Sequence, residues 1–140
     1  LNSTERVLHE VEVLKLALRC KPHDRFMLVT DAWSNVGTTL TSFQLQGATI
    51  HVRDGVCIDE KGVLAGSAMD MSRAVRNAVD LLGASLPEAL TMASAAPAAF
   101  LGLGHQYGEI AKGFRANFVI ADAALTVRET WIDGVSSGRD

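Results

Sequence analysis

The sequence has 140 residues, a length that suits one domain. Hydrophobic residues make up 48% and charged residues 21%, which excludes an intrinsically disordered chain. The formal net charge of −3 is small and evenly spread, and no apolar run approaches the roughly 18 residues of a membrane-spanning helix, so neither nucleic acid nor a membrane is an expected partner.

The amino-terminal part of the chain predicts a helix followed by a buried strand. Apolar residues keep helical spacing over 7–18, and Pro22 ends that pattern because proline cannot continue a helix. The run 26–29 is apolar without alternation, which is typical of a strand covered on both faces in a parallel sheet. A helix and a buried strand together form half of an α/β repeat.

Asp31 follows this predicted strand. In α/β folds catalytic groups gather at the carboxyl ends of parallel strands, and a carboxylate there can accept a proton from water and return it. The alternative is a structural role, in which the Asp31 side chain accepts hydrogen bonds from the backbone of its own loop. Its position alone leaves both roles open.

The middle of the chain predicts a β-hairpin within 43–58. Residues 49–53 alternate, Asp54 and Gly55 form the turn, and 56–58 are the second strand. The stretch "LAGS" at 64–67 has no clear periodicity. Its small residues either bring backbone amides close to a ligand or form a tight turn before the next helix.

Helices are predicted over 70–101 and strands near the carboxyl end. Gly83 is a natural helix stop, and Ser85 with Glu88 forms the pattern of a capping box at the start of a second helix. Alternation predicts strands at 117–121 and from Val127, the latter ending in a turn at Asp133–Gly134.

The histidines and cysteines show no metal-site pattern. None of the four histidines has the spacing of a zinc motif, and we favour structural roles for His23, His51 and His105, while His9 is either a surface residue or a ligand contact. The two cysteines, at positions 20 and 57, have no CxxC partner and are expected to be reduced thiols of a cytoplasmic protein, with a disulfide between them as the alternative.

Four stretches in a fixed order carry a family resemblance. They are "LVTDAW" at 28–33, "GVLAGSAM" at 62–69, "APAAFLGL" at 96–103 and "GEIAKGFRANFVIAD" at 108–122. Together they resemble the C-terminal part of the N-acetylglucosamine-6-phosphate deacetylases, which belong to the amidohydrolase superfamily. The resemblance covers nearly the whole chain, and its first three stretches are its most specific part.

The resemblance implies an α/β fold, namely a metal-dependent (β/α)8 barrel accompanied by a small β-sandwich. The chain would be a C-terminal fragment of it. Residues 1–104 would be the C-terminal portion of the hydrolase barrel, with the last strand at 26–30, the hairpin at 43–58 and helices at 70–101. Residues 105–140 would be the C-terminal strands of the small β-sandwich.

The resemblance also implies a reaction and its residues. The family hydrolyses the N-acetyl group of N-acetylglucosamine 6-phosphate in amino-sugar catabolism and releases glucosamine 6-phosphate and acetate. Asp31 would be the catalytic acid/base. Leu64, Ala65 and Gly66 match the family's substrate-contacting loop, and His9 matches a substrate-contacting histidine.

The family cofactor is a divalent metal, zinc or iron, held by a glutamate and two histidines from an earlier part of the family chain. These ligands are not in this chain, so we expect it to be catalytically incomplete by itself. Two alternatives remain: another amidohydrolase-superfamily hydrolase or deaminase, and a non-catalytic remnant. We also expect a homo-oligomer, because the open strand edges of a barrel fragment would seek partners.

Overall fold

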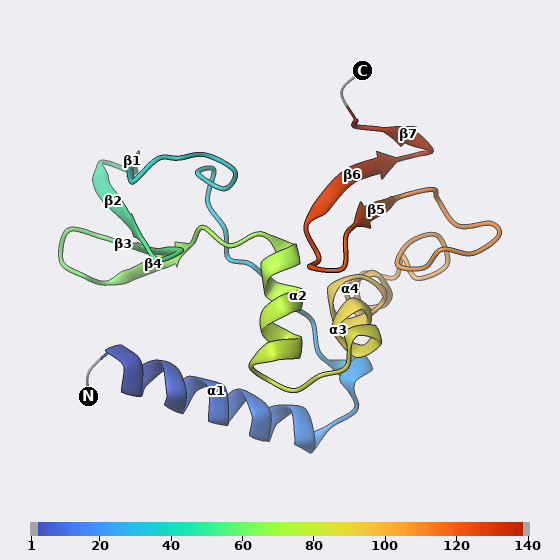
Figure 1. Cartoon of the computed structure of the whole chain (residues 1–140), viewed down its shortest axis with the longest axis horizontal. Helices are drawn as coiled ribbons and strands as arrows, with labels where there is room; N and C mark the ends of the chain where they lie inside the picture. Colours follow the sequence, from blue (N-terminus) through green and yellow to red (C-terminus); the bar gives the residue numbers. More distant parts are fainter. Residues whose placement is uncertain (1–2, 139–140) are drawn as a thin grey trace. The chain divides into compact units, whose positions relative to one another are not determined.

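The structure, a computed structural model, describes residues 3–138, with the side chains of 10–22 and 24–138. It divides into two compact units (Figure 1). Unit 1 comprises residues 1–28 and 75–140, and unit 2 comprises residues 29–74. Each unit is described by itself below.

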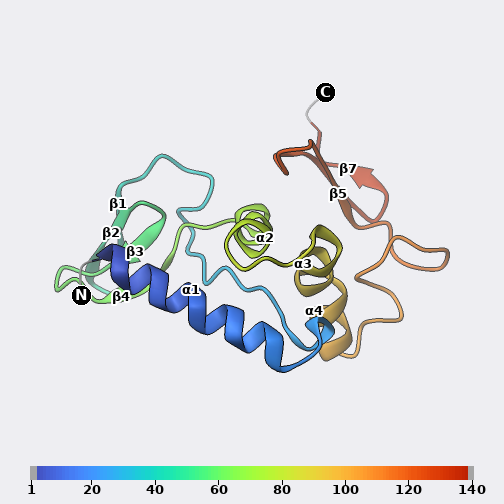
Figure 2. The ribbon, with the colours of Figure 1, turned by 60° about the horizontal axis from the view of Figure 1, so that its bottom comes forward.

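The predicted helices are confirmed. The chain begins with α1 (Ser3–Cys20) and a single 3₁₀ turn, η1 (His23–Arg25). Three further helices follow in the second half of the chain: α2 (Met71–Asp80), α3 (Leu86–Ala93) and α4 (Ala95–Phe100). Helices α3 and α4 lie side by side in both ribbon views (Figures 1 and 2).

The core of unit 1 is made of small and flexible apolar side chains. Its buried members are Val75, Ala78, Ala84, Ala89 and Met92. Partly buried apolar side chains from α1, the segment after η1 and the carboxyl-terminal part complete it, among them Leu18, Phe26, Leu28 and Leu125. Alanines let backbones approach closely, and methionine fills the irregular space between them.

Two local signals of the sequence are confirmed at the end of α2 and the start of α3. Gly83 has φ +77°, a left-handed conformation that glycine adopts without steric cost, and its N–H donates to the Val79 carbonyl at 3.2 Å. The Ser85 backbone N–H donates to the Glu88 carboxylate at 2.8 Å, and the Glu88 N–H donates back to the Ser85 hydroxyl at 3.5 Å. This is the predicted capping box.

The carboxyl-terminal strands form a three-stranded antiparallel sheet in the order β5 (Phe118–Ala121), β6 (Val127–Ile132) and β7 (Val135–Ser136). Phe118 and Trp131 stack across it with ring centroids 5.4 Å apart. At the predicted turn, Arg115 donates to both carboxylate oxygens of Asp133 at 2.7 Å.

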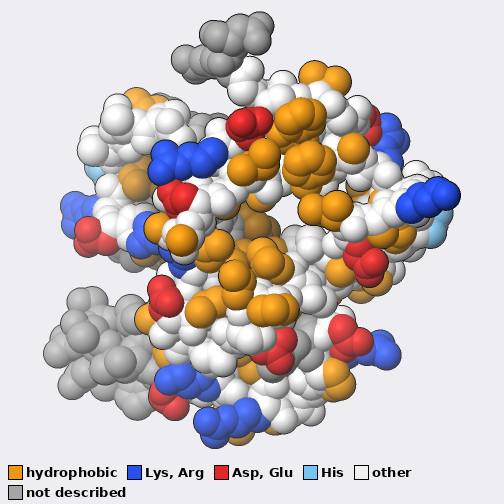
Figure 3. Space-filling model, turned by 45° about the vertical axis from the view of Figure 1, so that its right-hand side comes forward, with side chains coloured by type: hydrophobic (Ala, Val, Ile, Leu, Met, Phe, Trp, Pro, Cys, Tyr) orange, Lys and Arg blue, Asp and Glu red, His pale blue; other side chains and the backbone are white. Residues whose placement is uncertain are grey.

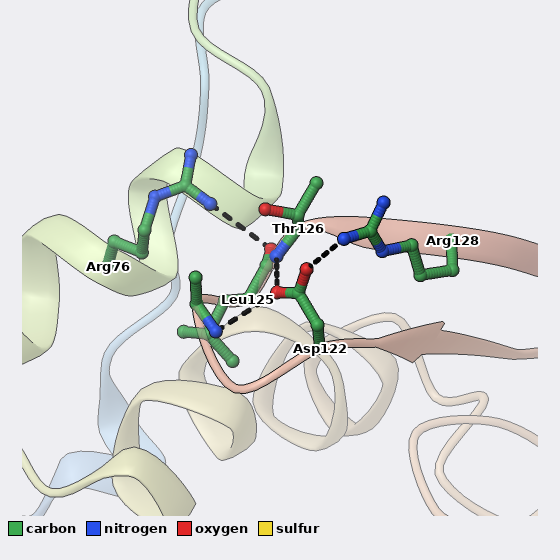
Figure 4. A network of polar contacts seen from close by, with 6 residues as sticks. Arg76, Asp122, Leu125, Thr126 and Arg128 are labelled. Carbon is green, nitrogen blue, oxygen red and sulfur yellow. Dashed lines mark hydrogen bonds and ion pairs between the residues drawn. The ribbon is translucent and has the colours of Figure 1, made fainter.

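The turn between β5 and β6 is organised by Asp122 (Figure 4). Its carboxylate accepts from the Thr126 N–H at 2.9 Å and from Arg128 at 2.6 Å, and the backbone bond is the main reason why the pKa of Asp122 lies below its ordinary value. The Arg76 guanidinium of α2 donates to the Leu125 carbonyl at 3.1 Å, which joins α2 to this turn within unit 1.

The prediction of a strand at 26–30 is wrong. No strand is formed there, because within residues 3–138 the segment has no neighbouring strand with which to exchange a ladder of hydrogen bonds. It is tied down by single bonds such as Leu28 N–H to the Met92 carbonyl, at 2.9 Å. Its exposure alternates: Phe26 and Leu28 pack on the core, whereas Val29 is 74% exposed.

Unit 2 is a four-stranded antiparallel sheet in sequence order: β1 (Ser42–Leu45), β2 (Ala48–Arg53), β3 (Val56–Ile58) and β4 (Leu64–Ser67). The predicted hairpin with its Asp54–Gly55 turn is confirmed. A second tight turn at Gln46–Gly47, which the sequence reading missed, joins β1 to β2. The "LAGS" stretch is strand β4 and not a tight turn.

Apolar side chains are also common on the surface (Figure 3). Ile110 is 85% exposed, Phe100 75% and Val135 70%. Among residues 3–138, none of the helices combines the length and the apolar character that crossing a membrane requires.

Candidate functional site

Asp31 lies beside strand β4 in unit 2. The Asp31 carbonyl accepts the Ser67 N–H at 2.8 Å, and the Ser67 carbonyl accepts the Trp33 N–H at 3.1 Å, so that 31–33 forms a parallel bridge with β4. Asp31 has φ +50° and is exposed. Aspartate is among the residues that adopt this left-handed conformation more readily, and here the turn leaves the carboxylate accessible to solvent.

Ser67 fastens the bridge with its side chain. Its hydroxyl donates to the Thr30 carbonyl and accepts the Met69 N–H at 3.1 Å. The backbone and side chain of this serine therefore hold both the residue before Asp31 and Asp31 itself. The segment that carries the carboxylate is fixed against β4 although 26–30 is not a strand.

The Trp33 side chain reaches across the same bridge. Its Nε1–H donates to the Ala65 carbonyl at 2.6 Å. Trp33 is half-buried, and the hydrogen bond satisfies its indole N–H as buried tryptophans require.

Gly66 is required by this packing. It has φ +136°, and a Cβ at this position would lie 2.4 Å from Trp33 Nε1 and 2.9 Å from the Asp31 carbonyl oxygen. Gly66 is buried and Ala65 half-buried, whereas the Leu64 side chain is 68% exposed. The exposed groups of this arrangement are the Asp31 carboxylate and the Leu64 side chain.

A buried pair, Asn35 and Cys57, connects the loop after Asp31 to strand β3. Asn35 is 3% exposed and its Oδ1 has no hydrogen-bond partner, while Cys57 of β3 is fully buried. Burial raises the pKa of the Cys57 thiol; a hydrogen bond from the Asn35 side chain opposes this effect, and the negative charge of Asp31 adds to it. Both cysteines are free thiols, as predicted.

The described histidines, His51 and His105, do not join Asp31 in a metal site. Among the side chains that the structure describes, those of residues 10–22 and 24–138, no group of three or more His, Cys, Asp or Glu lies close enough to hold a metal ion. His51 is half-buried in β2, and His105 is exposed with its Nε2 2.8 Å from Gln106. The side chains of His9 and His23 lie outside the described residues, so the roles predicted for them stay predictions.

Sequence reasoning missed the residues that build this arrangement, above all Trp33, Ser67 and Asn35. A glycine between a small residue and a serine in "LAGS" was the available signal, because such glycines permit close approach of another group. The approaching group is the indole of Trp33 and not a ligand.

Comparison with protein families decides the family of this chain. The family model described as "Amidohydrolase family" matches residues 13–137. The chain belongs to the amidohydrolase family. The match includes both Asp31 and strand β4, so this amidohydrolase carries its candidate site inside the family region.

Within this family, the chain is similar to deacetylases of amino-sugar phosphates. An N-acetylgalactosamine-6-phosphate deacetylase of Shewanella is 40% identical over 128 residues, which cover 91% of this chain and 32% of that protein. An Escherichia coli protein, provisionally named an N-acetylgalactosamine-6-phosphate deacetylase, is 36% identical over 127 residues, which cover 90% of this chain and 76% of that protein. The chain thus spans about a third of one relative and three quarters of the other.

The solved structures that resemble this chain are also deacetylases of an amino-sugar phosphate. The N-acetylglucosamine-6-phosphate deacetylase of Pasteurella multocida has a TM-score of 0.86 at 34% identity and is matched over 92% of this chain and 34% of its own. The Mycobacterium smegmatis enzyme, an aspartate-to-alanine mutant in complex with N-acetyl-D-glucosamine-6-phosphate, has a TM-score of 0.77 at 27% identity, over 90% and 34%. The chain matches a third of each structure.

Proposed function

We propose that this amidohydrolase chain carries the acid/base residue and part of the sugar site of a deacetylase that acts on an N-acetylhexosamine 6-phosphate. The observation that supports it best is the parallel bridge between Ala32 and Ser67, in which the Ser67 N–H donates to the Asp31 carbonyl. The backbone of the exposed Asp31 therefore lies beside strand β4, which contains residues 64–66, so that the two elements with resemblance-implied roles are neighbours in space.

Asp31 would act as the proton carrier of the hydrolysis. Its carboxylate would accept a proton from the water that attacks the acetamide carbon, and would deliver it to the amine nitrogen as the C–N bond breaks. Acetate and the amino-sugar phosphate are the products. The left-handed backbone at Asp31, and the hydrogen bonds from Ser67 to the carbonyls of Thr30 and Asp31, would hold the carboxylate in place for both transfers.

The described side chains do not fit the family's metal by themselves, because they assemble no cluster of suitable ligands. We therefore propose that metal ligands come from polypeptide outside these 140 residues, as the resemblance implies. The position of Asp31 at the surface of unit 2 leaves it accessible to such a partner.

The sugar isomer is the finer question. The resemblance implies N-acetylglucosamine 6-phosphate, and the structure from Pasteurella multocida carries that sugar in its name. The Shewanella relative, at the higher identity of 40%, is named for the galactosamine isomer. Both sugars are candidate substrates, and a direct comparison of the two decides between them.

The test measures acetate release from each sugar phosphate by the purified chain, with zinc or ferrous iron added, against a metal-only blank and the Asp31→Asn variant. We expect no release by the chain alone, and release that depends on Asp31 when the chain is mixed with the matching amino-terminal part of a relative. Release that survives Asp31→Asn would overturn the assignment of the acid/base.

The predicted homo-oligomer and cytoplasmic location stay predictions. The exposed apolar side chains, such as those of Phe100 and Ile110, support the oligomer because large exposed apolar groups mark contact surfaces. Light scattering of the purified chain tests it, and a monomer at all concentrations would contradict it.

A further inference from the structure

We propose that Trp33 is a positioning residue, whose indole clamps the 64–66 stretch at a fixed distance from Asp31. The proposal rests on the proposed function for its meaning in catalysis. Trp33 itself is argued to act only through its neighbours. The group that it holds is the Ala65 carbonyl, through the 2.6 Å hydrogen bond from Nε1–H.

Trp33 makes two hydrogen bonds to strand β4, one from its backbone and one from its side chain. The backbone N–H of Trp33 binds the Ser67 carbonyl, while the side chain of the same residue binds the carbonyl two positions earlier in β4. A strand held at two points by one residue cannot slide along its neighbour without breaking both bonds. The register between Asp31 and Leu64 is therefore set by Trp33.

The hydrogen bond also decides which backbone groups a sugar could use. Because the Ala65 carbonyl already accepts the indole N–H, it is turned toward Trp33. Gly66 brings its backbone against the indole, with space for hydrogen but not for a methyl group. The clamp thus selects one face of the 64–66 stretch for packing and leaves the exposed Leu64 side for a ligand.

Trp131 provides a matched comparison inside the same chain. It too is half-buried and its Nε1–H is hydrogen-bonded, but to the side chain of Glu129 at 3.0 Å and within its own strand. That bond joins no second segment. The two tryptophans therefore differ in what the indole N–H holds, and Trp131→Phe is the control for Trp33→Phe.

The first measurement is amide hydrogen exchange of the unliganded chain by NMR. Phenylalanine keeps an aromatic ring but lacks the indole N–H. In Trp33→Phe we expect the Ser67 and Trp33 amides to exchange about two- to tenfold faster, the range that the loss of one hydrogen bond gives. The Val52 amide, bonded to the Thr41 carbonyl in the same unit, is expected to keep its protection. Trp131→Phe is expected to change none of these three.

The second measurement is the binding of N-acetylglucosamine 6-phosphate and of its galactosamine isomer, followed by the two indole N–H signals. In the wild type the Trp33 signal is expected to shift and the Trp131 signal to stay. The dissociation constant is expected to rise by about the same two- to tenfold in Trp33→Phe and to stay unchanged in Trp131→Phe.

The outcomes separate the two proposals. Unchanged exchange at Ser67 and Trp33 in Trp33→Phe overturns the clamp, and so does an equal rise at Val52, which would mean that Trp33 only fills space in the unit. Absence of binding of either sugar to the wild type, together with the expected exchange pattern, supports the clamp and counts against the proposed function.

Discussion

The two units are stabilised in different ways. Unit 1 buries alanine, valine and methionine side chains contributed by several helices, and its buried core cluster is wholly apolar. Unit 2 buries Ile50, Ala74, Cys57 and the polar Asn35, and its candidate site is held by backbone hydrogen bonds and by the close fit of Gly66. The comparison teaches that the apolar core supports the fold, while the candidate site lies where exact backbone geometry replaces side-chain volume.

Left-handed backbone occurs at non-glycine residues of both units, for example at Leu125 in unit 1 and at Asp31 in unit 2. Asp31 adopts a left-handed conformation next to a glycine that no other residue could replace without a clash. Uncommon backbone conformations persist where the surroundings over-determine them, and they cluster at functional sites. In unit 2 that over-determination comes from Ser67, which binds the backbones of Thr30, Asp31 and Trp33, and from the bond between the Trp33 indole and the Ala65 carbonyl.

The largest expected effect is on the core of unit 1. Met92 is 1% exposed, and Met92→Ala removes buried volume that the surrounding alanines cannot refill. We expect the free energy of unfolding to fall by about 2–5 kcal/mol. Urea denaturation followed by the helical circular dichroism signal measures it. The control is Leu90→Ala in the same helix, because Leu90 is 47% exposed and should cost far less. Equal costs would contradict the assigned core.

The next effect is on the geometry of unit 2. Gly66→Ala places a Cβ against the Trp33 indole and the Asp31 carbonyl, and it forces alanine to a positive φ, which costs about 1–3 kcal/mol before the clash is counted. Gly47→Ala is the matched control, since Gly47 also has a positive φ but has no atom within 4 Å of its Cβ position. Urea unfolding followed by Trp33 fluorescence, in a Trp131→Phe background, compares the two variants. If both lose the same stability, Gly66 is there only for its φ.

Chemical labelling of the two cysteines compares the solvent access of one thiol in each unit. Cys20 is exposed on α1 and Cys57 is buried in β3, where burial raises the pKa of the thiol. A disulfide reagent at about pH 8 is expected to label Cys20 at the rate of a free thiol and Cys57 only when unit 2 opens.

The raised pKa of Cys57 also gives the sign of a pH effect. Its contribution to stability is fully present below the unfolded thiol pKa of about 8.5 and is lost as the pH rises through the higher folded value. The unfolding midpoint of unit 2 should therefore fall above about pH 8.5 in the wild type and less so in Cys57→Ala. Rapid labelling of both thiols at neutral pH would contradict the buried position.

The smallest effect concerns the exposed pair Arg115 and Asp133 in unit 1. The hydrogen bonds from Arg115 lower the pKa of Asp133, so the pair contributes stability above the unfolded carboxyl pKa of about 4, and this is lost as the pH falls through the folded value. Exposed ion pairs contribute little. In Asp133→Asn we expect this slight loss of stability at acid pH to disappear. Trp131 fluorescence during acid titration measures it. An unchanged titration would show that the pair adds nothing.

The sequence by itself determined the local structure and the family. Periodicity placed the helices, and the capping box at Ser85 and Glu88 was readable because it is closed by residues three positions apart. The Asp54–Gly55 turn was readable for the same reason. The stretches around Asp31 and Leu64 were sufficient to indicate an amidohydrolase, since they stand in the family's order.

Only the tertiary structure decided how these stretches meet. The apolar run at 26–30 has the pattern of a strand, but a strand needs a partner strand. The pairing occurs after this run, as a parallel bridge between Ala32 and Ser67 of β4. The bond from Trp33 to Ala65 joins residues 32 positions apart, and no local pattern encodes such a pair. Local periodicity reports which faces are apolar, whereas the approach of two distant segments depends on packing that is settled only when the whole chain folds.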